Sequence, residues 1–230
     1  FRQLTIKSGA DQVSTGRTVL YYAHDPMCSW CYAFALVWEK VRGLLPTGVS
    51  LKTVLGGLAP DTETPMPPEM QEKIQGAWRR IENVVPGTEF NHDFWVGCEP
   101  RRSTYPACRA VIAAREQGAE HEYAMLASIQ RAYYREAKNP SLVETLTALA
   151  GGLGLDVQRF EATLTSEECE RMLQEEIGRS ISLGVRGFPA LILVNGNAGI
   201  HLQHDYNDAE LTVKRIIEGI DTLERRVAQE

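Results

Sequence analysis

Strand patterns occur in only two parts of this 230-residue chain, at residues 18–55 and 190–204, and helical patterns fill the stretch between them. That stretch has about 125 residues, too many for a structureless loop inside a compact domain. Thr-Val-Leu-Tyr-Tyr-Ala at 18–23 and Ala-Leu-Ile-Leu-Val at 190–194 show little polar alternation, as is typical of strands buried on both faces. The sequence therefore predicts one sheet that is interrupted by an inserted block of helices.

The first half of this sheet is predicted to be a βαβ unit. After a polar turn, apolar residues recur at helical spacing, at Phe34, Val37, Trp38, Val41 and Leu45. Residues 49–55 then alternate as a second strand, which Gly56 and Gly57 end. Two parallel strands joined by one helix should form a right-handed crossover.

The second half is predicted to be a hairpin followed by a helix. Asn195-Gly196 is a strong hairpin signal, and 200–204 is the expected return strand. Asn207 is expected to begin the last helix, with Glu210 as its capping-box partner. The helices predicted between the two halves span 66–85, 103–117, 120–137, 141–150, 156–164 and 166–183.

This order of elements predicts both the fold class and the domains. We expect an α/β protein with a large all-helical insertion between a βαβ half and a ββα half. Residues 17–56 plus 185–227 form the discontinuous sheet domain, and residues 57–184 form the inserted helical subdomain.

The composition excludes several classes of protein. Hydrophobic residues make up 43% and charged residues 23% of the chain, close to globular averages, so disorder is not expected. The net charge of −6, without any basic run, argues against a nucleic-acid partner. No apolar stretch reaches about 18 residues, so no membrane span is expected. The oligomeric state is left open.

Cys28 and Cys31 are the strongest chemical signal in the sequence. They stand at C-x-x-C spacing where a buried strand ends and a helix starts. The first turn of a helix offers unpaired backbone N–H groups and the positive end of the helix dipole, which stabilise a thiolate, the attacking form of cysteine. One cysteine can attack a disulfide, and the other can resolve the mixed disulfide that results.

Two structural roles compete for the same pair. As half of a zinc site it would need a second Cys or His pair, and no such spacing exists. His201 and His204 lie three apart on a predicted strand and so face opposite sides. As a buried pair the two cysteines would act only as small apolar residues. We therefore expect no metal site.

The loop Gly184-Val185-Arg186-Gly187-Phe188-Pro189 directly precedes the 190–194 strand and is the second signal. A proline is permitted at the first residue of a strand, because no ladder N–H is lost there. Pro189 is either a simple strand-entry proline or a cis proline whose loop lies against Cys28.

Together these features resemble the thioredoxin fold, and the long helical insertion resembles its DsbA-like branch. Asp-Pro-Met-Cys-Ser-Trp-Cys-Tyr at 25–32, with Tyr-Pro-Ala-Cys-Arg-Ala-Val at 105–111 opening an inserted helix, is similar to the FrnE-type candidate protein disulfide isomerases. The similarity runs from about residue 17 to 225. It implies that Cys28 is the nucleophile, that Cys31 resolves, and that Pro189 is a cis proline that docks extended substrate together with Phe188.

The chain also departs from that family. Ser29 and Trp30 replace the Gly-Pro of thioredoxin and the Pro-His of DsbA, so we expect a weaker oxidant than DsbA. His24 is a candidate for tuning the thiol pKa in place of the missing histidine. Asp25 could relay protons, or its charge could raise the thiol pKa. Trp30 is either an apolar contact for substrate or a partly buried helix residue.

Three other cysteines stand apart from the pair. Cys108 is expected in the apolar core, and Cys98 is either a reactive loop thiol or a disulfide partner of Cys108. Cys169 stands among acidic residues, which disfavour a thiolate. Unpaired cysteines favour the cytoplasm, whereas a signal peptide removed before Phe1 would place the protein in the periplasm or outside the cell.

The leading functional hypothesis is a thiol–disulfide oxidoreductase or isomerase that acts on protein or small-molecule thiols and disulfides through Cys28. It needs no bound cofactor, and glutathione or a thioredoxin-type partner would supply electrons. The alternative is a glutathione-dependent enzyme of the kappa transferase or hydroxychromene-carboxylate isomerase type; these resemble the same architecture but commonly have serine at the position of Cys28. A third possibility is a non-enzymatic adaptor that leaves the C-x-x-C pair idle.

Overall fold

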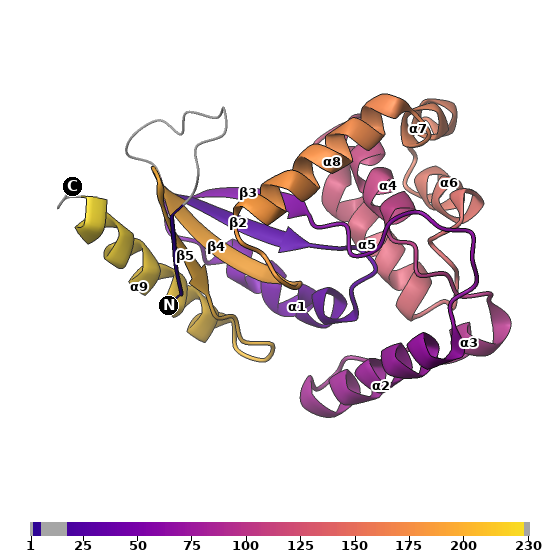
Figure 1. Ribbon diagram of the computed structural model, residues 1–230, viewed down its shortest axis with the longest axis horizontal. Coiled ribbons are helices and arrows are strands. Elements are labelled where there is room, and N and C mark those ends of the chain that lie inside the picture. The colour runs from indigo at the N-terminus through magenta and orange to yellow at the C-terminus, as the bar shows by residue number, and fades with distance from the viewer. Residues whose placement is uncertain (1, 6–17, 228–230) are drawn as a thin grey trace. The chain divides into compact units, whose positions relative to one another are not determined.

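The structure is a computed structural model that describes residues 2–5 and 18–227 (Figure 1). Contacts divide the chain into two compact units. Unit 1 comprises the described residues of Phe1–His24, Ala33–Gly56 and Ile177–Glu230, and unit 2 comprises Asp25–Tyr32 and Gly57–Glu176. Unit 1 thus lacks Asp25–Tyr32, which the predicted sheet domain included, and its last segment starts earlier than residue 185. Residue 17, where that domain was predicted to begin, lies outside the described residues, and the domain boundaries stay a prediction.

Unit 1 contains a five-stranded mixed sheet in the order β1-β5-β4-β2-β3. Its centre is β2 (Val19–His24), which pairs in parallel with β3 (Ser50–Leu55) and antiparallel with β4 (Ala190–Asn195). The hairpin strand β5 (Ala198–Leu202) continues the sheet to β1 (Arg2–Thr5). The predicted arrangement of a sheet split by a helical insertion is therefore confirmed.

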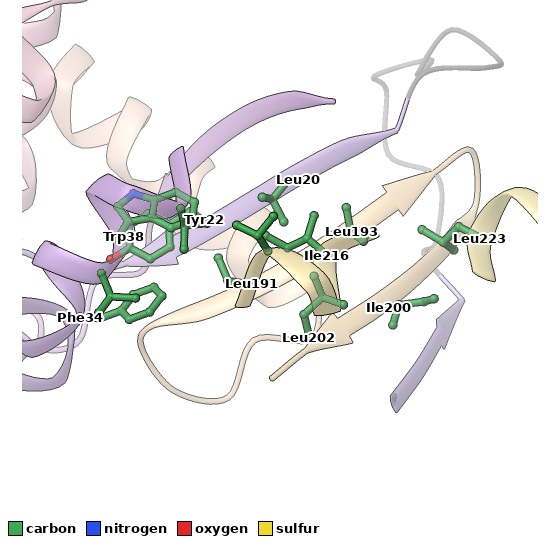
Figure 2. Packing of buried hydrophobic residues seen from close by; sticks show 13 residues of the cluster. Leu20, Tyr22, Phe34, Trp38, Leu191, Leu193, Ile200, Leu202, Ile216 and Leu223 are labelled. Carbon is green, nitrogen blue, oxygen red and sulfur yellow. The ribbon is translucent and has the colours of Figure 1, made fainter. Parts of the chain in front are cut away.

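Helices α1 (Ser29–Gly43) and α9 (Ala209–Val227) cover one face of this sheet. Alternate residues of β2 and β4 point to this face, and Figure 2 shows their side chains packed with those of the two helices. The labelled residues of this core are Leu20, Tyr22, Phe34, Trp38, Leu191, Leu193, Ile200, Leu202, Ile216 and Leu223. Because β2 is buried on both faces, its sequence lacks polar alternation.

The intervening residues of the same strands form a second, smaller core on the opposite face. Val19, Tyr21 and Ala23 of β2 pack there with Ile192 and Val194 of β4. Leu183, directly after α8 (Glu167–Ser182), joins them, and Phe188 packs partly against this cluster. The loop that precedes β4 is thus anchored to the sheet.

Unit 2 is almost entirely helical. Most residues of its central helix α4 (Tyr105–Arg115) are buried. Around α4 pack α5 (His121–Tyr134), α6 (Val143–Gly152) and α7 (Val157–Leu164). Helix α2 (Pro68–Val84) contributes Trp78, whose buried ring contacts an aromatic cluster made of Phe90, His92, Phe94, Trp95, Tyr133 and Tyr134. None of the helices in the described part of the chain has the length and apolar character to cross a membrane.

Four local features differ from the sequence-based prediction. Strand β1 and the one-turn helix α3 (Phe94–Gly97) were not predicted. The last helix begins at Ala209, and Asp208 rather than Asn207 caps it, because the Asp208 carboxylate accepts the Leu211 N–H at 2.9 Å. His24, predicted in a turn, is the last residue of β2.

Candidate active site

Cys28 lies directly before the first turn of α1, and Cys31 lies within that turn. The Cys28 carbonyl accepts the Tyr32 N–H at 3.0 Å, and the Cys28 N–H donates to the Asp25 carbonyl at 3.1 Å. Cys28 therefore stands at the helix N-terminus, as the motif predicted. Neither cysteine forms a disulfide; Cys28 is 8% exposed and Cys31 only 1%. Cys28 is the more accessible of the two.

The surroundings of Cys31 favour its neutral thiol. Burial is the main cause that raises the pKa of Cys31 well above its ordinary value, and a hydrogen bond with Cys28 adds to it. The negative charge of Asp25 acts in the same direction, while a hydrogen bond from the Asp25 backbone acts against it. Cys31 therefore keeps its proton at neutral pH until some group takes it.

The Asp25 side chain is fully buried and accepts four hydrogen bonds. Its Oδ1 accepts the Met27 N–H at 2.8 Å. Its Oδ2 accepts the Leu58 N–H at 2.7 Å, the Thr104 hydroxyl at 2.7 Å and the Cys108 thiol at 3.6 Å. The carboxylate thus ties the segment before α1 to residues more than thirty positions further along the chain.

Burial raises the pKa of Asp25 above its ordinary value of 3.8. Its hydrogen bonds act in the opposite direction, because each donor stabilises the charged form, but they do not cancel the cost of removing the carboxylate from water. Asp25 was one of the two residues predicted to tune the cysteine pair. Its charge does raise the pKa of Cys31, so one of its two predicted effects is present in the structure.

Cys108 and Thr104 are the residues of this cluster that sequence reasoning did not assign to the site. Cys108 is completely buried, as predicted, but its thiol also donates to Asp25. The predicted alternative of a Cys98–Cys108 disulfide is wrong, because both thiols are free and the Cys98 thiol donates instead to the Ala137 carbonyl at 3.0 Å. The only signal that pointed to this region was the Tyr-Pro-Ala-Cys run at 105–108.

Aromatic side chains flank the cysteine pair on α1. Trp30, predicted to be either exposed or partly buried, is half-buried, and the Arg80 guanidinium lies 5.9 Å from the centre of its ring. The Tyr32 ring stacks on that of Tyr134 at 4.5 Å. The Tyr32 hydroxyl donates to the Glu89 carbonyl at 3.3 Å. These contacts connect the first turn of α1 to the aromatic cluster of unit 2.

His24, the other residue predicted to tune the pair, belongs to unit 1. Its side chain is buried, and its ring stacks on that of Tyr22 with centroids 4.9 Å apart. Its backbone carbonyl accepts the Gly56 N–H at 2.7 Å. The effect of His24 on the thiols stays a prediction.

The loop before β4 has the predicted backbone, since the Phe188–Pro189 peptide bond is cis. The Phe188 ring lies directly over Gly56, where a Cβ atom would be only 1.9 Å from the ring. Only glycine leaves room for this contact, which orients the loop within unit 1. Docking of substrate by Phe188 and Pro189 stays a prediction.

The remaining thiol, Cys169, is buried and contacts the backbone carbonyl of Arg109 at 3.5 Å. Burial raises the pKa of Cys169 to about 12, so it stays a neutral thiol, although the cause is burial more than the neighbouring acids that the sequence suggested. Among the described residues, no group of three or more His, Cys, Asp or Glu side chains is arranged to hold a metal ion.

Comparison with known proteins places these features in a family. Residues 19–210 match the sequence profile of the DSBA-like thioredoxin domain. The chain is also 21% identical over 198 residues to the ClpXP adapter protein SpxH of Shouchella clausii (strain KSM-K16), covering 81% of this chain and 62% of that protein. The chain therefore spans about three fifths of the length of this curated relative.

Solved structures show the same fold. A candidate protein disulfide isomerase from Nitrosomonas europaea has a TM-score of 0.76 at 29% identity, with 92% of this chain and 99% of that chain covered. The cytosolic disulfide reductase DsbM from Pseudomonas aeruginosa has a TM-score of 0.67 at 24% identity, covering 92% of this chain and 100% of that one. DsbM has also been solved with GSH. The predicted thioredoxin-like fold with a helical insertion is confirmed.

Proposed function

Since the chain belongs to the DSBA-like thioredoxin domain family, we propose that it is a thiol–disulfide oxidoreductase that works through Cys28 and Cys31. The observation that carries the proposal is the asymmetry of the pair. Cys28 is the more exposed thiol and stands at the N-terminus of α1, whereas Cys31 is buried and its pKa is raised. A nucleophile must reach its substrate, whereas a resolving thiol needs only to reach its neighbour.

In the reductive direction, the Cys28 thiolate attacks one sulfur of a substrate disulfide. The substrate S–S bond breaks, one substrate thiolate leaves and takes up a proton, and Cys28 is held in a mixed disulfide. Cys31 then loses its proton and attacks the Cys28 sulfur, which releases the second substrate thiol. The substrate gains two electrons and two protons, and the protein ends with a Cys28–Cys31 disulfide. The reverse sequence oxidises a substrate dithiol.

Asp25 supplies the acceptor for the Cys31 proton in this proposal. A thiolate and a carboxylate side by side in a buried site would repel each other, as the effect of Asp25 on the pKa of Cys31 indicates. Transfer of the proton from the thiol to the carboxylate keeps a single negative charge in the site during resolution. The raised pKa of Asp25 brings its proton affinity closer to that of the thiol.

The rest of the site is proposed from the family resemblance. Trp30, Phe188 and Pro189 would contact extended substrate, and His24 would help to tune the pair. Protein or small-molecule thiols and disulfides would be the substrates, and glutathione or a thioredoxin-type protein would exchange electrons with the Cys28–Cys31 pair. The structural likeness to DsbM, solved with GSH, supports glutathione. We propose a cytoplasmic location, which the free thiols of Cys98, Cys108 and Cys169 support.

Brief labelling of the reduced protein with iodoacetamide at neutral pH tests the assignment of the nucleophile. We expect Cys28 to be alkylated first, Cys31 hardly at all, and Cys98 slowly, because burial raises the pKa of Cys98. Peptide mass spectrometry measures the three sites separately. Preferential labelling of Cys31 would contradict the assignment.

Trapping tests the division of labour between the two cysteines. Cys31→Ser should accumulate a mixed disulfide with substrate through Cys28, because the resolving thiol is missing, whereas Cys28→Ser should accumulate none. Cys169→Ser is the matched control, since that buried thiol donates to the Arg109 backbone carbonyl, and it should turn over normally. Equal trapping by both active-site variants would refute the scheme.

The likeness to SpxH favours a second candidate, an adaptor that binds a partner protein without redox chemistry. In that case the C-x-x-C pair would be idle, and Cys28→Ser would bind the partner as well as the parent chain does. A glutathione-dependent transferase or isomerase would instead consume no electrons and would tolerate loss of Cys31. A titration of the pair in glutathione redox buffers, followed by thiol quantification, separates both from the oxidoreductase.

A further inference from the structure

The four hydrogen-bond donors of Asp25 differ in what they can do when the carboxylate takes up a proton. The Met27 and Leu58 N–H groups are fixed backbone donors. The Thr104 hydroxyl has a second acceptor, because its Oγ1 lies 3.4 Å from the Ala59 carbonyl as well as 2.7 Å from Asp25 Oδ2. Thr104 can therefore donate to a charged carboxylate, or turn to Ala59 and accept from a protonated one.

The Cys108 thiol, unlike the Thr104 hydroxyl, cannot turn to accept a hydrogen bond from a protonated Asp25. An S–H group donates a hydrogen bond, but sulfur is a weak acceptor. Burial, with the charge of Asp25, raises the pKa of Cys108 well above its ordinary value, so it remains a donor throughout the working range. Its contact with Oδ2 at 3.6 Å thus stabilises the charged carboxylate and offers little to the protonated one.

We propose that Cys108 is a positioning residue of the redox site, whose thiol holds the Asp25 carboxylate in its charged form as the acceptor for the Cys31 proton. The inference rests on the proposed function. In the resolving step the proton of Cys31 passes to Asp25, the sulfur electron pair forms the bond to Cys28, and the Cys28–substrate S–S bond breaks with its electrons on the substrate sulfur. That sulfur then takes up a proton.

Other titratable groups also act on this cluster through their charges. Cys31 of α1 and Tyr133 and Tyr134 of α5 interact electrostatically with Asp25. Glu176 of α8 interacts with Cys108. Burial raises the pKa of both tyrosines, so they are neutral. Glu176 is paired with Arg115. The Asp25 titration is therefore governed mainly by its burial and its four donors.

Stopped-flow reaction with 5,5′-dithiobis(2-nitrobenzoate) reads the two cysteines separately. Attack by Cys28 releases one thionitrobenzoate, and attack by Cys31 on the resulting mixed disulfide releases a second. All proteins carry Cys98→Ser, because that half-exposed thiol would add its own release. The rate of the second phase is measured from acidic to mildly alkaline pH. The acid limb of this profile, where the rate falls toward low pH, reports the pH at which Asp25 becomes able to accept a proton.

In Cys108→Ala we expect this acid limb to move to higher pH by about half to one unit, the size expected when one weak hydrogen bond to a charged group is lost. Cys108→Ser keeps a donor and should stay close to the parent. Cys169→Ala is the matched control, because it also removes a buried thiol from unit 2 but does not touch Asp25, and its limb should not move. The first phase should stay within about twofold of the parent in all three variants.

Asp25→Asn distinguishes an action through Asp25 from a general loosening of the site. The acid limb should disappear in Asp25→Asn, and adding Cys108→Ala should then change nothing further. An unshifted limb in Cys108→Ala, or a further effect of it in the Asp25→Asn background, would overturn the inference while leaving the proposed function intact. A parent protein without a second phase would overturn both. Cys108→Val, which lacks a donor but fills the space, replaces Cys108→Ala if that variant does not fold.

Discussion

Burial shifts three side chains around the cysteine pair toward their neutral forms. It is the first cause of the raised pKa of Cys31, of Asp25 and of Tyr134. Two of these groups have hydrogen bonds that offset part of this shift, since Asp25 accepts four hydrogen bonds and Cys31 has one with the Asp25 backbone. As neutral groups, Cys31 and Tyr134 keep extra negative charge away from Cys28.

The Tyr134 hydroxyl differs, because it is buried and has no hydrogen-bond partner among the described residues. We expect Tyr134→Phe to leave the free energy of unfolding unchanged or to raise it by up to about 1–2 kcal/mol, since an unsatisfied buried hydroxyl is removed and the ring stays. Urea unfolding measures this. Tyr32→Phe is the control, because its hydroxyl donates to Glu89 and its loss should lower stability by about 0.5–1 kcal/mol. A loss of more than 1 kcal/mol in Tyr134→Phe would show that this hydroxyl is satisfied after all.

At the scale of helices and strands, two glycines in helix interiors illustrate how packing decides the effect of the same substitution. A Cβ atom on Gly178 of α8 would meet nothing within 4 Å. A Cβ atom on Gly219 of α9 would lie 2.7 Å from Leu193 Cδ1 and 2.9 Å from Leu202 Cδ2. Gly219 is therefore the point where α9 approaches β4 and β5 closely.

Gly178→Ala should stabilise the protein by about 0.5–1 kcal/mol through higher helix propensity. Gly219→Ala should destabilise it, because overpacking a full core costs about 1–3 kcal/mol and outweighs the same propensity gain. Chemical denaturation of both variants gives the comparison. Equal stability of Gly219→Ala and Gly178→Ala would contradict this prediction. It would show that the Leu193 and Leu202 side chains can shift to admit the added methyl group.

Elements with a strong internal pattern could be predicted from the sequence, and those that depend on distant partners could not. The central strands, the hairpin and the long helices carry apolar periodicity and turn signals of their own. Strand β1 is four residues long and exists through its pairing with β5, nearly two hundred positions away. The short α3 has no room for a periodic pattern.

The candidate site divides in the same way. Cys28, Cys31 and Asp25 are neighbours in the chain, so their motif is visible in the sequence. Thr104 and Cys108 lie 79 and 83 positions after Asp25 in the chain, and no residue spacing in the sequence predicts such a contact. Their assignment to the site required the folded structure of unit 2.

For the whole molecule, the pH dependence of stability should contain a contribution from His204. Burial lowers the pKa of this histidine from 6.5 to about 4, and its ring packs against those of Phe34 and Tyr206. Because the folded-state pKa lies below the unfolded one, the contribution is fully present above pH 6.5 and is lost as the pH falls toward about 4. Asp25 acts in the opposite sense, since its raised pKa lowers stability as the pH rises above 3.8.

Replacing His204 by Phe isolates this contribution, because the aromatic packing is kept and the titration is removed. The free energy of unfolding of His204→Phe, compared with the parent by urea denaturation at pH 7.5 and pH 5, should fall less on acidification. Proton NMR of the His204 ring in the folded parent should give a midpoint near pH 4. A midpoint near 6.5 would show that the ring is solvated.

The order of strands also determines when the sheet can be completed during synthesis. β2 pairs with β3 soon after both leave the ribosome, but its other neighbour, β4, follows only after the whole stretch from Gly56 to Pro189 has been made. At 5–20 residues per second this delay is on the order of ten seconds. Every residue of unit 2 precedes β4 in the chain. The contacts of Asp25 with Thr104 and Cys108 can therefore form first, while one edge of β2 is still unpaired.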